Sequence, residues 1–172
     1  MSNFAFLHLP EWAFLFESAS KAEELANTDA RASCFYARRT LELAVAWLYK
    51  HDRSLRLPYQ DNLSALIHEP TFRQTVGDAL FTKARLIKDL GNMAVHSSKK
   101  IVTLDAINTT RELFHICYWL ARTYGRTSRP DPSQCFDINL LPKAAAVVAQ
   151  APQQTTEQLQ KLEASLQAKD EH

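Results

Sequence analysis

Glycine, strand-like alternation and excess charge are all scarce in this chain, and each scarcity excludes some fold classes or functions. Only three of the 172 residues are glycine, and no segment sustains the alternation of apolar and polar residues that marks a half-buried strand. Lys and Arg number 20 and Asp and Glu number 19, which gives a formal net charge of +1. This balance excludes the global positive field of non-specific DNA binders, so any nucleic-acid contact would come from local patches.

Cysteine and long apolar runs are also rare. The three cysteines, Cys34, Cys117 and Cys135, form no Cys-x-x-Cys pair, which excludes a zinc ribbon and gives no support to a disulfide framework. The apolar N-terminal stretch lacks a basic start and is interrupted by His8 and Glu11, so it is not a signal peptide. No apolar run approaches the ~20 residues that span a bilayer. We therefore expect a cytoplasmic protein without membrane contact.

Apolar residues recur at helical spacing along most of the chain, which predicts an all-α fold, an antiparallel bundle of about four to five helices. Asp29 and Thr103 are the predicted N-caps, and Pro70 and Gly125 the predicted stops. The helices are expected over about residues 11–27, 30–51, 62–68, 78–97 and 103–124. The predicted buried positions of the second and last helices are Cys34, Ala37, Leu41, Ala44, Val45, Leu48, Ile107, Thr110, Leu113, Phe114, Cys117, Leu120, Ala121 and Tyr124.

The composition changes after Gly125, which predicts a bundle domain over residues 1–125. Residues 126–154 hold prolines and read as a linker or a strap along the bundle, docked in part through Leu140, Leu141, Val147 and Val148. Residues 155–172 place leucines at alternating three- and four-residue spacing, as at the start of a coiled-coil-like helix. Because so short a helix is marginal alone, we expect the chain to be the N-terminal piece of a larger protein, with a homodimer as one outcome.

Motifs of known catalytic sites are missing. The chain has no phosphate-binding glycine loop, no Gly-x-Ser-x-Gly and no His-Glu-x-x-His, and its six histidines are scattered. Glu112 and His115 are three residues apart on a helix, which predicts a surface ion pair or an imidazole at the core edge. No metal site or cofactor is predicted for this part of the protein.

The segment Gly91–His96 concentrates the unusual residues of the chain. Asn92 and His96 are four residues apart on a predicted helix and share one face, directly after a glycine that costs about 1 kcal/mol relative to alanine. Three interpretations stay open: a helix–helix contact locked by Asn92, a catalytic pair with His96 as general acid or base, and a polar contact site for a partner. Gly91 fits the first and third, because it lets another helix approach closely.

A second polar group, Arg38, Arg39 and Glu42, has the spacing of helix-surface ion pairs. Alternatively, one arginine turns inward, is paired by Glu42 and contacts the face of Asn92 and His96, since an unpaired buried charge is very costly. Other basic spots read as solvated faces or, alternatively, as DNA contacts. They are Lys99, Lys100, Arg122, Arg126 and Arg129.

Five stretches together resemble the N-terminal region of the R subunit of type I restriction–modification enzymes. The resemblance covers residues 1–125 closely and continues in character beyond them. It implies that the domain precedes a nuclease domain and a helicase motor, in a subunit that joins methyltransferase and specificity subunits, hydrolyses ATP with Mg²⁺, translocates DNA and cuts it as an endonuclease. None of those catalytic motifs lies within the 172 residues. The stretches are Met1–Phe6, Arg31–His51, Asn62–Phe72, Leu80–His96 and Arg111–Tyr124.

The domain is also similar to HEPN ribonucleases and their inactive cousins, whose motif is Arg-polar-x-x-x-His. Asn92 and His96 match it, but Gly91 stands where the arginine belongs, and loss of such a cation costs about 3–4 kcal/mol in comparable sites. We therefore expect a non-catalytic docking module that contacts the methyltransferase and specificity subunits or the nuclease–motor body, with DNA in the full complex. The alternatives are a HEPN-type ribonuclease or toxin-like enzyme using His96, and a DNA-binding accessory module.

Overall fold

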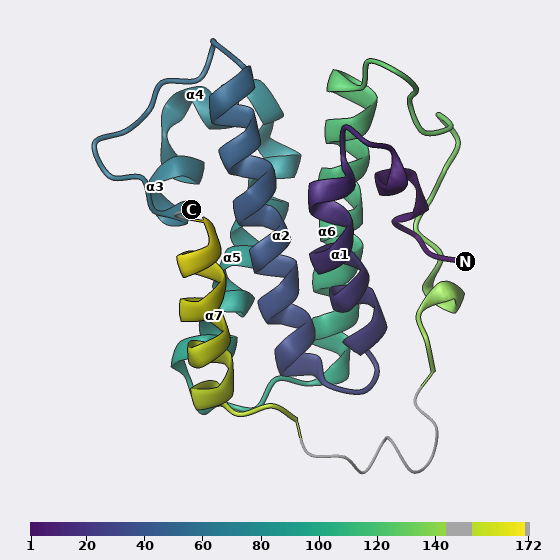
Figure 1. Cartoon of the computed structure of the whole chain (residues 1–172), viewed down its shortest axis with the longest axis vertical. Coiled ribbons are helices and arrows are strands. Elements are labelled where there is room, and N and C mark those ends of the chain that lie inside the picture. The colour runs from purple at the N-terminus through teal and green to yellow at the C-terminus, as the bar shows by residue number, and fades with distance from the viewer. Residues whose placement is uncertain (144–152, 171–172) are drawn as a thin grey trace.

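Helices form all the regular structure in the described part of the chain, residues 1–143 and 153–170 of a computed structural model (Figure 1). This confirms the predicted all-α bundle. Two short 3₁₀ helices, η1 and η2, accompany the α-helices. The elements are η1 (Ala5–His8), α1 (Ala13–Leu25), α2 (Ala30–His51), α3 (Leu63–His68), α4 (Pro70–Val76), α5 (Asp78–His96), α6 (Thr103–Tyr124), η2 (Ile138–Leu140) and α7 (Thr156–Asp170).

Helix α2 is the centre of the bundle and packs against α1, α5 and α6. All six of its predicted apolar positions are buried. On α6, six of the eight predicted positions are buried, and the other two, Ile107 and Tyr124, are partly buried and pack against the core. Helical periodicity therefore identified the core-facing side of both long helices. In the described ranges, no helix combines the length and apolar content that crossing a bilayer requires.

The helix ends agree with the sequence in part. The Asp29 side chain caps α2 by accepting a hydrogen bond from the Ala32 amide at 3.1 Å, as predicted. Thr103 was wrongly predicted as a cap. Val102 holds the N-cap position, and the Asp105 carboxylate accepts from its amide at 3.4 Å. The side chain of the third helical residue thus accepts a hydrogen bond from the backbone amide of the N-cap residue, which is one half of a capping box.

Pro70 begins a helix that was not predicted from the sequence. It follows the end of α3 and is also the first residue of α4, where its fixed φ suits a helix and its lack of an amide hydrogen costs nothing. Glu69 caps α4 by accepting from the Thr71 amide at 2.7 Å. A proline predicted only as a stop is therefore also a start.

The segment after Gly125 runs back along the bundle to the N-terminus (Figure 1). The side chain of Asn3 joins the two, because its oxygen accepts from the Asp137 amide at 2.8 Å and its nitrogen donates to the Asp137 carbonyl at 3.0 Å. Leu141 is buried, so the predicted strap is docked there. Val147 and Val148 lie outside the described residues.

Helix α7 returns to the opposite side of the bundle and packs against α5 (Figure 1). Leu159 is completely buried, and Leu162 and Leu166 pack partly buried against the same core. The leucines predicted to begin a coiled coil thus contact the bundle of their own chain. The start of α7 is held at the start of α2, where the Gln154 amide donates to the Asp29 carboxylate at 3.0 Å.

Candidate functional site

Gly91 lies where α5 crosses α2 over Arg38. A Cβ added at Gly91 would overlap the Arg38 Cβ and come within 2.8 Å of its Cδ and 2.9 Å of its Cγ. These atoms form the stem of a side chain that is only 5% exposed, so they have little freedom to move. The glycine therefore permits the close approach of the two helices.

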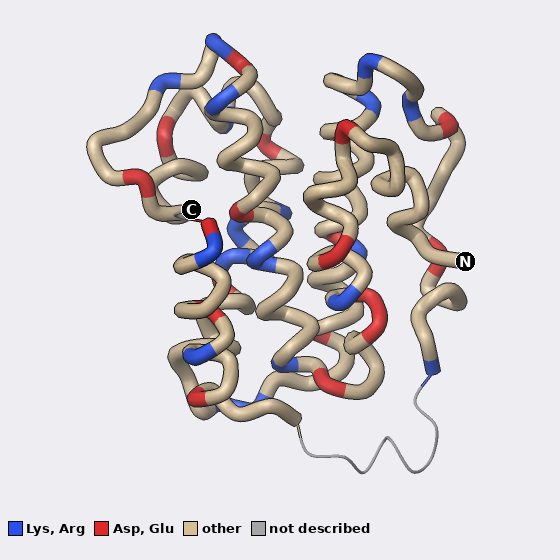
Figure 2. Tube along the Cα trace, viewed as in Figure 1, with Lys and Arg blue, Asp and Glu red and all other residues tan. Residues whose placement is uncertain are grey.

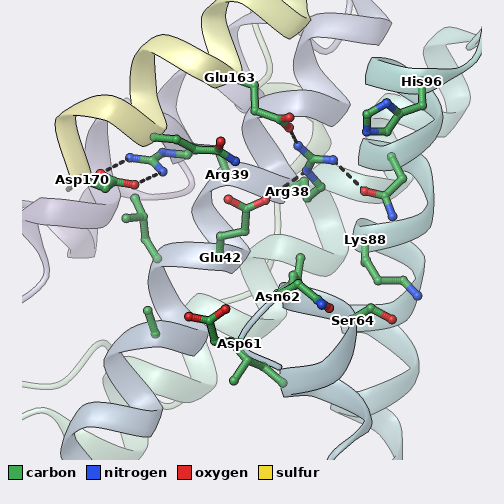
Figure 3. Close-up of a pocket in the computed structure, with 16 residues that line it drawn as sticks. Arg38, Arg39, Glu42, Asp61, Asn62, Ser64, Lys88, His96, Glu163 and Asp170 are labelled. Carbon is green, nitrogen blue, oxygen red and sulfur yellow. Dashed lines mark hydrogen bonds and ion pairs between the residues drawn. The ribbon is translucent and has the colours of Figure 1, made fainter. Parts of the chain in front are cut away.

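Arg38 is the centre of the polar group between α2, α5 and α7 (Figure 3). Its Nη1 donates to the Asn92 side-chain oxygen at 2.6 Å, and its Nη2 donates to the Glu163 carboxylate. Its Nε lies 3.2 Å from a Glu42 oxygen, within ion-pair distance, but has no hydrogen-bond partner among the described residues. One of the twin arginines thus turns inward and meets both predicted partners, Glu42 and Asn92.

Burial shifts the pKa values of Arg38 and Glu42. Burial lowers the pKa of Arg38, and the charge of Glu42 offsets part of that effect. Burial likewise raises the pKa of Glu42, although Arg38 and Arg39 both pull it down. Desolvation thus favours the neutral form of each group, and the opposite charge beside each one offsets part of that effect.

Arg39 points the other way along α7 and holds its end. Its Nη1 and Nη2 donate to the two carboxylate oxygens of Asp170 at 2.6 and 2.8 Å, a two-pronged ion pair. These hydrogen bonds raise the pKa of Arg39 and lower the pKa of Asp170. Both arginines therefore bind a carboxylate supplied by α7.

A pocket of about 470 Å³ opens beside the two arginines. His96 lies on the pocket side of α5, as Figure 3 shows. Asn92 also lines the pocket, and both side chains are exposed. Five of the six residues of the predicted polar contact site thus line one pocket, and the sixth, Gly91, packs against the Arg38 side chain. The lining residues are Arg38, Arg39, Glu42, Leu43, Ala46, Asp61, Asn62, Leu63, Ser64, Leu66, Lys88, Asn92, His96, Glu163, Gln167 and Asp170.

The predicted DNA contacts do not form one patch. Lys99 and Lys100 lie between α5 and α6, whereas Arg122, Arg126 and Arg129 lie at the other end of α6, a helix about 33 Å long from its 22 residues. The Arg122 side chain donates to the Pro130 carbonyl, and that of Arg129 to the Gly125 carbonyl. Lys and Arg also alternate with Asp and Glu along the bundle (Figure 2).

The His115 Nδ1 lies 3.2 Å from a Glu112 carboxylate oxygen, so the two residues that the sequence placed three apart on a helix are neighbours. Lys83 joins them from α5, donating to Glu112 and lying 2.9 Å from the His115 Nδ1. None of the three lines the pocket. The cluster therefore joins α5 to α6 and is separate from the candidate site.

Arg31 makes buried contacts that were not predicted from the sequence. Arg31 lies about two helical turns before Arg38 on α2. Its Nη1 donates to the carbonyls of Met93, Ala94 and Ser97 at 3.2, 2.8 and 2.7 Å. Its Nη2 donates to the Lys99 carbonyl. The guanidinium satisfies the free carbonyls at the end of α5, where a cation is also favoured by the helix dipole. The sequence did hold a signal for this contact, because a spacing of seven residues puts Arg31 on the same face of the helix as Arg38.

The structure gives little support to a reactive buried thiol or to a metal site among the described residues. Cys34 and Cys117 are buried, as predicted, and burial raises the pKa of both thiols to about 12. Both are therefore protonated at neutral pH and unreactive. Across the described ranges, no group of three or more His, Cys, Asp or Glu side chains is arranged to hold a metal ion.

The family comparison covers this site. Residues 20–162 match the family described as Domain of unknown function (DUF4145), a range that begins within α1, contains Arg38, Arg39, Asn92 and His96, and ends within α7. Comparisons with curated proteins and with solved structures find no match. Since the matched range spans most of the sequence, the chain belongs to the DUF4145 family.

Proposed function

We propose that this chain is a non-catalytic docking module that holds an acidic amphipathic helix in the groove between α2 and α5. The observation that carries the proposal is the seat of α7 in that groove. Leu159 is buried there, and Arg38 and Arg39 each bind a carboxylate of the docked helix. Helix-in-groove recognition usually combines apolar anchor residues on one face of the helix with charged contacts beside them.

The docked helix depends on these contacts. α7 has 15 residues, and isolated helices of that length are marginal in water. Burial of a leucine such as Leu159 contributes about 1.5–3 kcal/mol. The Gln160 side chain adds a hydrogen bond to the Val95 carbonyl at 2.9 Å, near the end of α5. The bundle therefore supplies most of the stability of the helix that it holds.

The resemblance to type I restriction R subunits suggests where such docking would be used. In that setting the bundle would contact the methyltransferase and specificity subunits, or would fix the nuclease–motor body of the same chain through α7. DNA cleavage, ATP and Mg²⁺ would belong to the rest of the R subunit. The missing arginine at Gly91 supports a role in assembly instead of catalysis.

Deletion of residues 1–125 from an intact R subunit tests this role. We expect the deleted subunit to co-purify with the methyltransferase and specificity subunits at least about tenfold less well, or to keep assembly and lose coupled translocation and cleavage. A point variant, Arg39→Glu, should weaken the same property. Arg53→Glu, at an exposed position outside the pocket, is the matched control. Unchanged assembly, translocation and cleavage after the deletion would exclude the docking role.

One observation favours a second function, a ribonuclease using His96. Arg38 brings a guanidinium to within 2.6 Å of Asn92, so a cation reaches this face from α2 although Gly91 lacks one. The test is an RNA-cleavage assay without metal, comparing the chain with His96→Ala. Cleavage that the substitution abolishes would establish the enzyme and contradict the non-catalytic proposal, and no cleavage by either protein would dismiss it.

A further inference from the structure

We infer that α7 occupies its groove in place of an acidic amphipathic helix from a partner protein, and that the partner helix carries a bulky apolar residue at the position where α7 has Gln167. This assignment rests on the proposed docking function and names the kind of helix that the groove takes. It makes α7 an internal competitor of that helix.

The contacts of α7 specify one part of the partner helix. Leu159, Leu162 and Leu166 pack against the core of the bundle. Glu163 and Asp170, seven residues apart and therefore on one face of the helix, bind the two arginines of α2. A partner helix that uses the same groove must therefore offer apolar residues and two carboxylates at these spacings.

Helix α7 leaves part of the groove unfilled. The pocket of about 470 Å³ has α7 on one side, and Asn62 and Ser64 at the start of α3 on the other (Figure 3). Leu43, Leu63 and Leu66 line it with apolar surface. Recognition interfaces pack at their core as densely as protein interiors, so an open pocket of this size indicates that the groove is wider than the helix it holds.

Gln167 is the α7 residue whose replacement would use this space. It lies four residues after Glu163 and three before Asp170, so the three share one face of the helix, and all three line the pocket. The Gln167 side chain is exposed. A leucine, methionine or phenylalanine in its place would bury apolar surface against the leucines of α2 and α3. Because burial of such a side chain strengthens binding by about tenfold or more, this position separates α7 from a tighter partner.

Tethering explains how a loosely fitting helix keeps the groove. Helix α7 belongs to the same chain, so it competes at an effective concentration set by its linker and not by the amount of protein in solution. A free helix with the sequence of α7 loses that competition, whereas a helix with a better fit at one position can win it. The coupling is reciprocal, because a partner that displaces α7 is itself weakened by α7.

The first test strengthens α7 within the full chain. Gln167→Leu should slow amide hydrogen exchange of residues 156–170 at least about fivefold, because it buries apolar surface in the pocket. Lys161→Leu is the matched control, since Lys161 is exposed on α7, does not line the pocket and has nearly the helix propensity of leucine. It should leave the exchange unchanged. Equal exchange in the two variants would overturn the inference.

The second test supplies the partner as a fluorescent peptide with the sequence of residues 153–170. The peptide with Gln167→Leu should bind the full chain at least about tenfold more tightly than the unchanged peptide. Adding Glu163→Gln/Asp170→Asn to that peptide should remove the gain. A full chain with Leu159→Asp, which loses the buried anchor of α7, should bind each peptide more tightly than the unchanged chain does.

Each result bears on one part of the assignment. Equal binding of the Gln167→Leu and unchanged peptides would overturn the apolar position of the partner helix. Equal binding by the Leu159→Asp and unchanged chains would show that α7 is no competitor. Both results are separable from the docking test, because the docking role fails when deletion of residues 1–125 leaves assembly, translocation and cleavage unchanged.

Discussion

At the residue scale, Gly91 offers a prediction whose sign is decided by packing. Helix propensity alone predicts that Gly91→Ala stabilises the protein by about 1 kcal/mol. The overlap of the new Cβ with the Arg38 stem predicts the reverse, a loss of about 1–3 kcal/mol in the free energy of unfolding. Urea denaturation measures the difference, with Asp89→Ala on the exposed face of α5 as control. A stabilised Gly91→Ala protein would show that the helices do not cross there.

Arg31 carries a second prediction at this scale. Arg31→Met leaves the carbonyls at the end of α5 without their donor and should lower the free energy of unfolding by about 2–3 kcal/mol. Arg53→Met removes an exposed arginine and should change it by less than about 0.5 kcal/mol. Equal effects of the two substitutions in urea denaturation would contradict the buried role of Arg31.

The sequence predicted some residue contacts and missed others for a physical reason. Spacing on two helices suggested that one of the twin arginines turns inward to Glu42 and the Asn92 face, since a buried arginine needs a carboxylate. It did not decide between Arg38 and Arg39, and the structure places Arg38 there. Nothing local marked Glu163, because it lies 125 positions from Arg38. Such contacts follow from tertiary packing, which helical periodicity does not encode.

At the element scale, α7 depends on an ion pair that responds to pH. Hydrogen bonds from Arg39 lower the pKa of Asp170 in the folded chain. A depressed carboxylate pKa stabilises docking above the unfolded value of about 3.9, and this contribution is lost as the pH falls through the folded value. NMR titration of the Asp170 carboxyl should give a pKa below about 3.9, returning toward that value in Arg39→Met. An ordinary pKa in both proteins would contradict the pair.

The strap gives another prediction for a single element. Asn3 holds residues 134–143 to the N-terminus and also donates to the buried Glu23 at 2.9 Å. Asn3→Ala should therefore lower the free energy of unfolding by about 1–3 kcal/mol and speed hydrogen exchange in the strap. Among the described residues, the exposed Asn139 donates a hydrogen bond from its backbone amide to the Asp137 carboxylate and none from its side chain, so Asn139→Ala is the control. Unchanged exchange in Asn3→Ala would show that the strap is held elsewhere.

At the scale of the whole molecule, the bundle was predictable and the seat of its last helix was not. Helix periods identified α2, α5 and α6, because these long helices bury one face against neighbours close in the chain. The leucines of α7 fit both a coiled coil and a groove on the bundle, and the sequence pattern alone favoured the coiled coil. The groove that seats α7 carries the docking function that we propose.

Hydrogen exchange of α7 in a charge-swap series tests the seat of α7 most directly. Arg39→Glu should raise the exchange rates of residues 156–170 at least about tenfold, because it places two carboxylates side by side. Adding Asp170→Arg should restore the protection, whereas Arg53→Glu should leave it unchanged. Equal protection of α7 in all four proteins would contradict the claim that the twin arginines of the α2–α5 groove hold this helix.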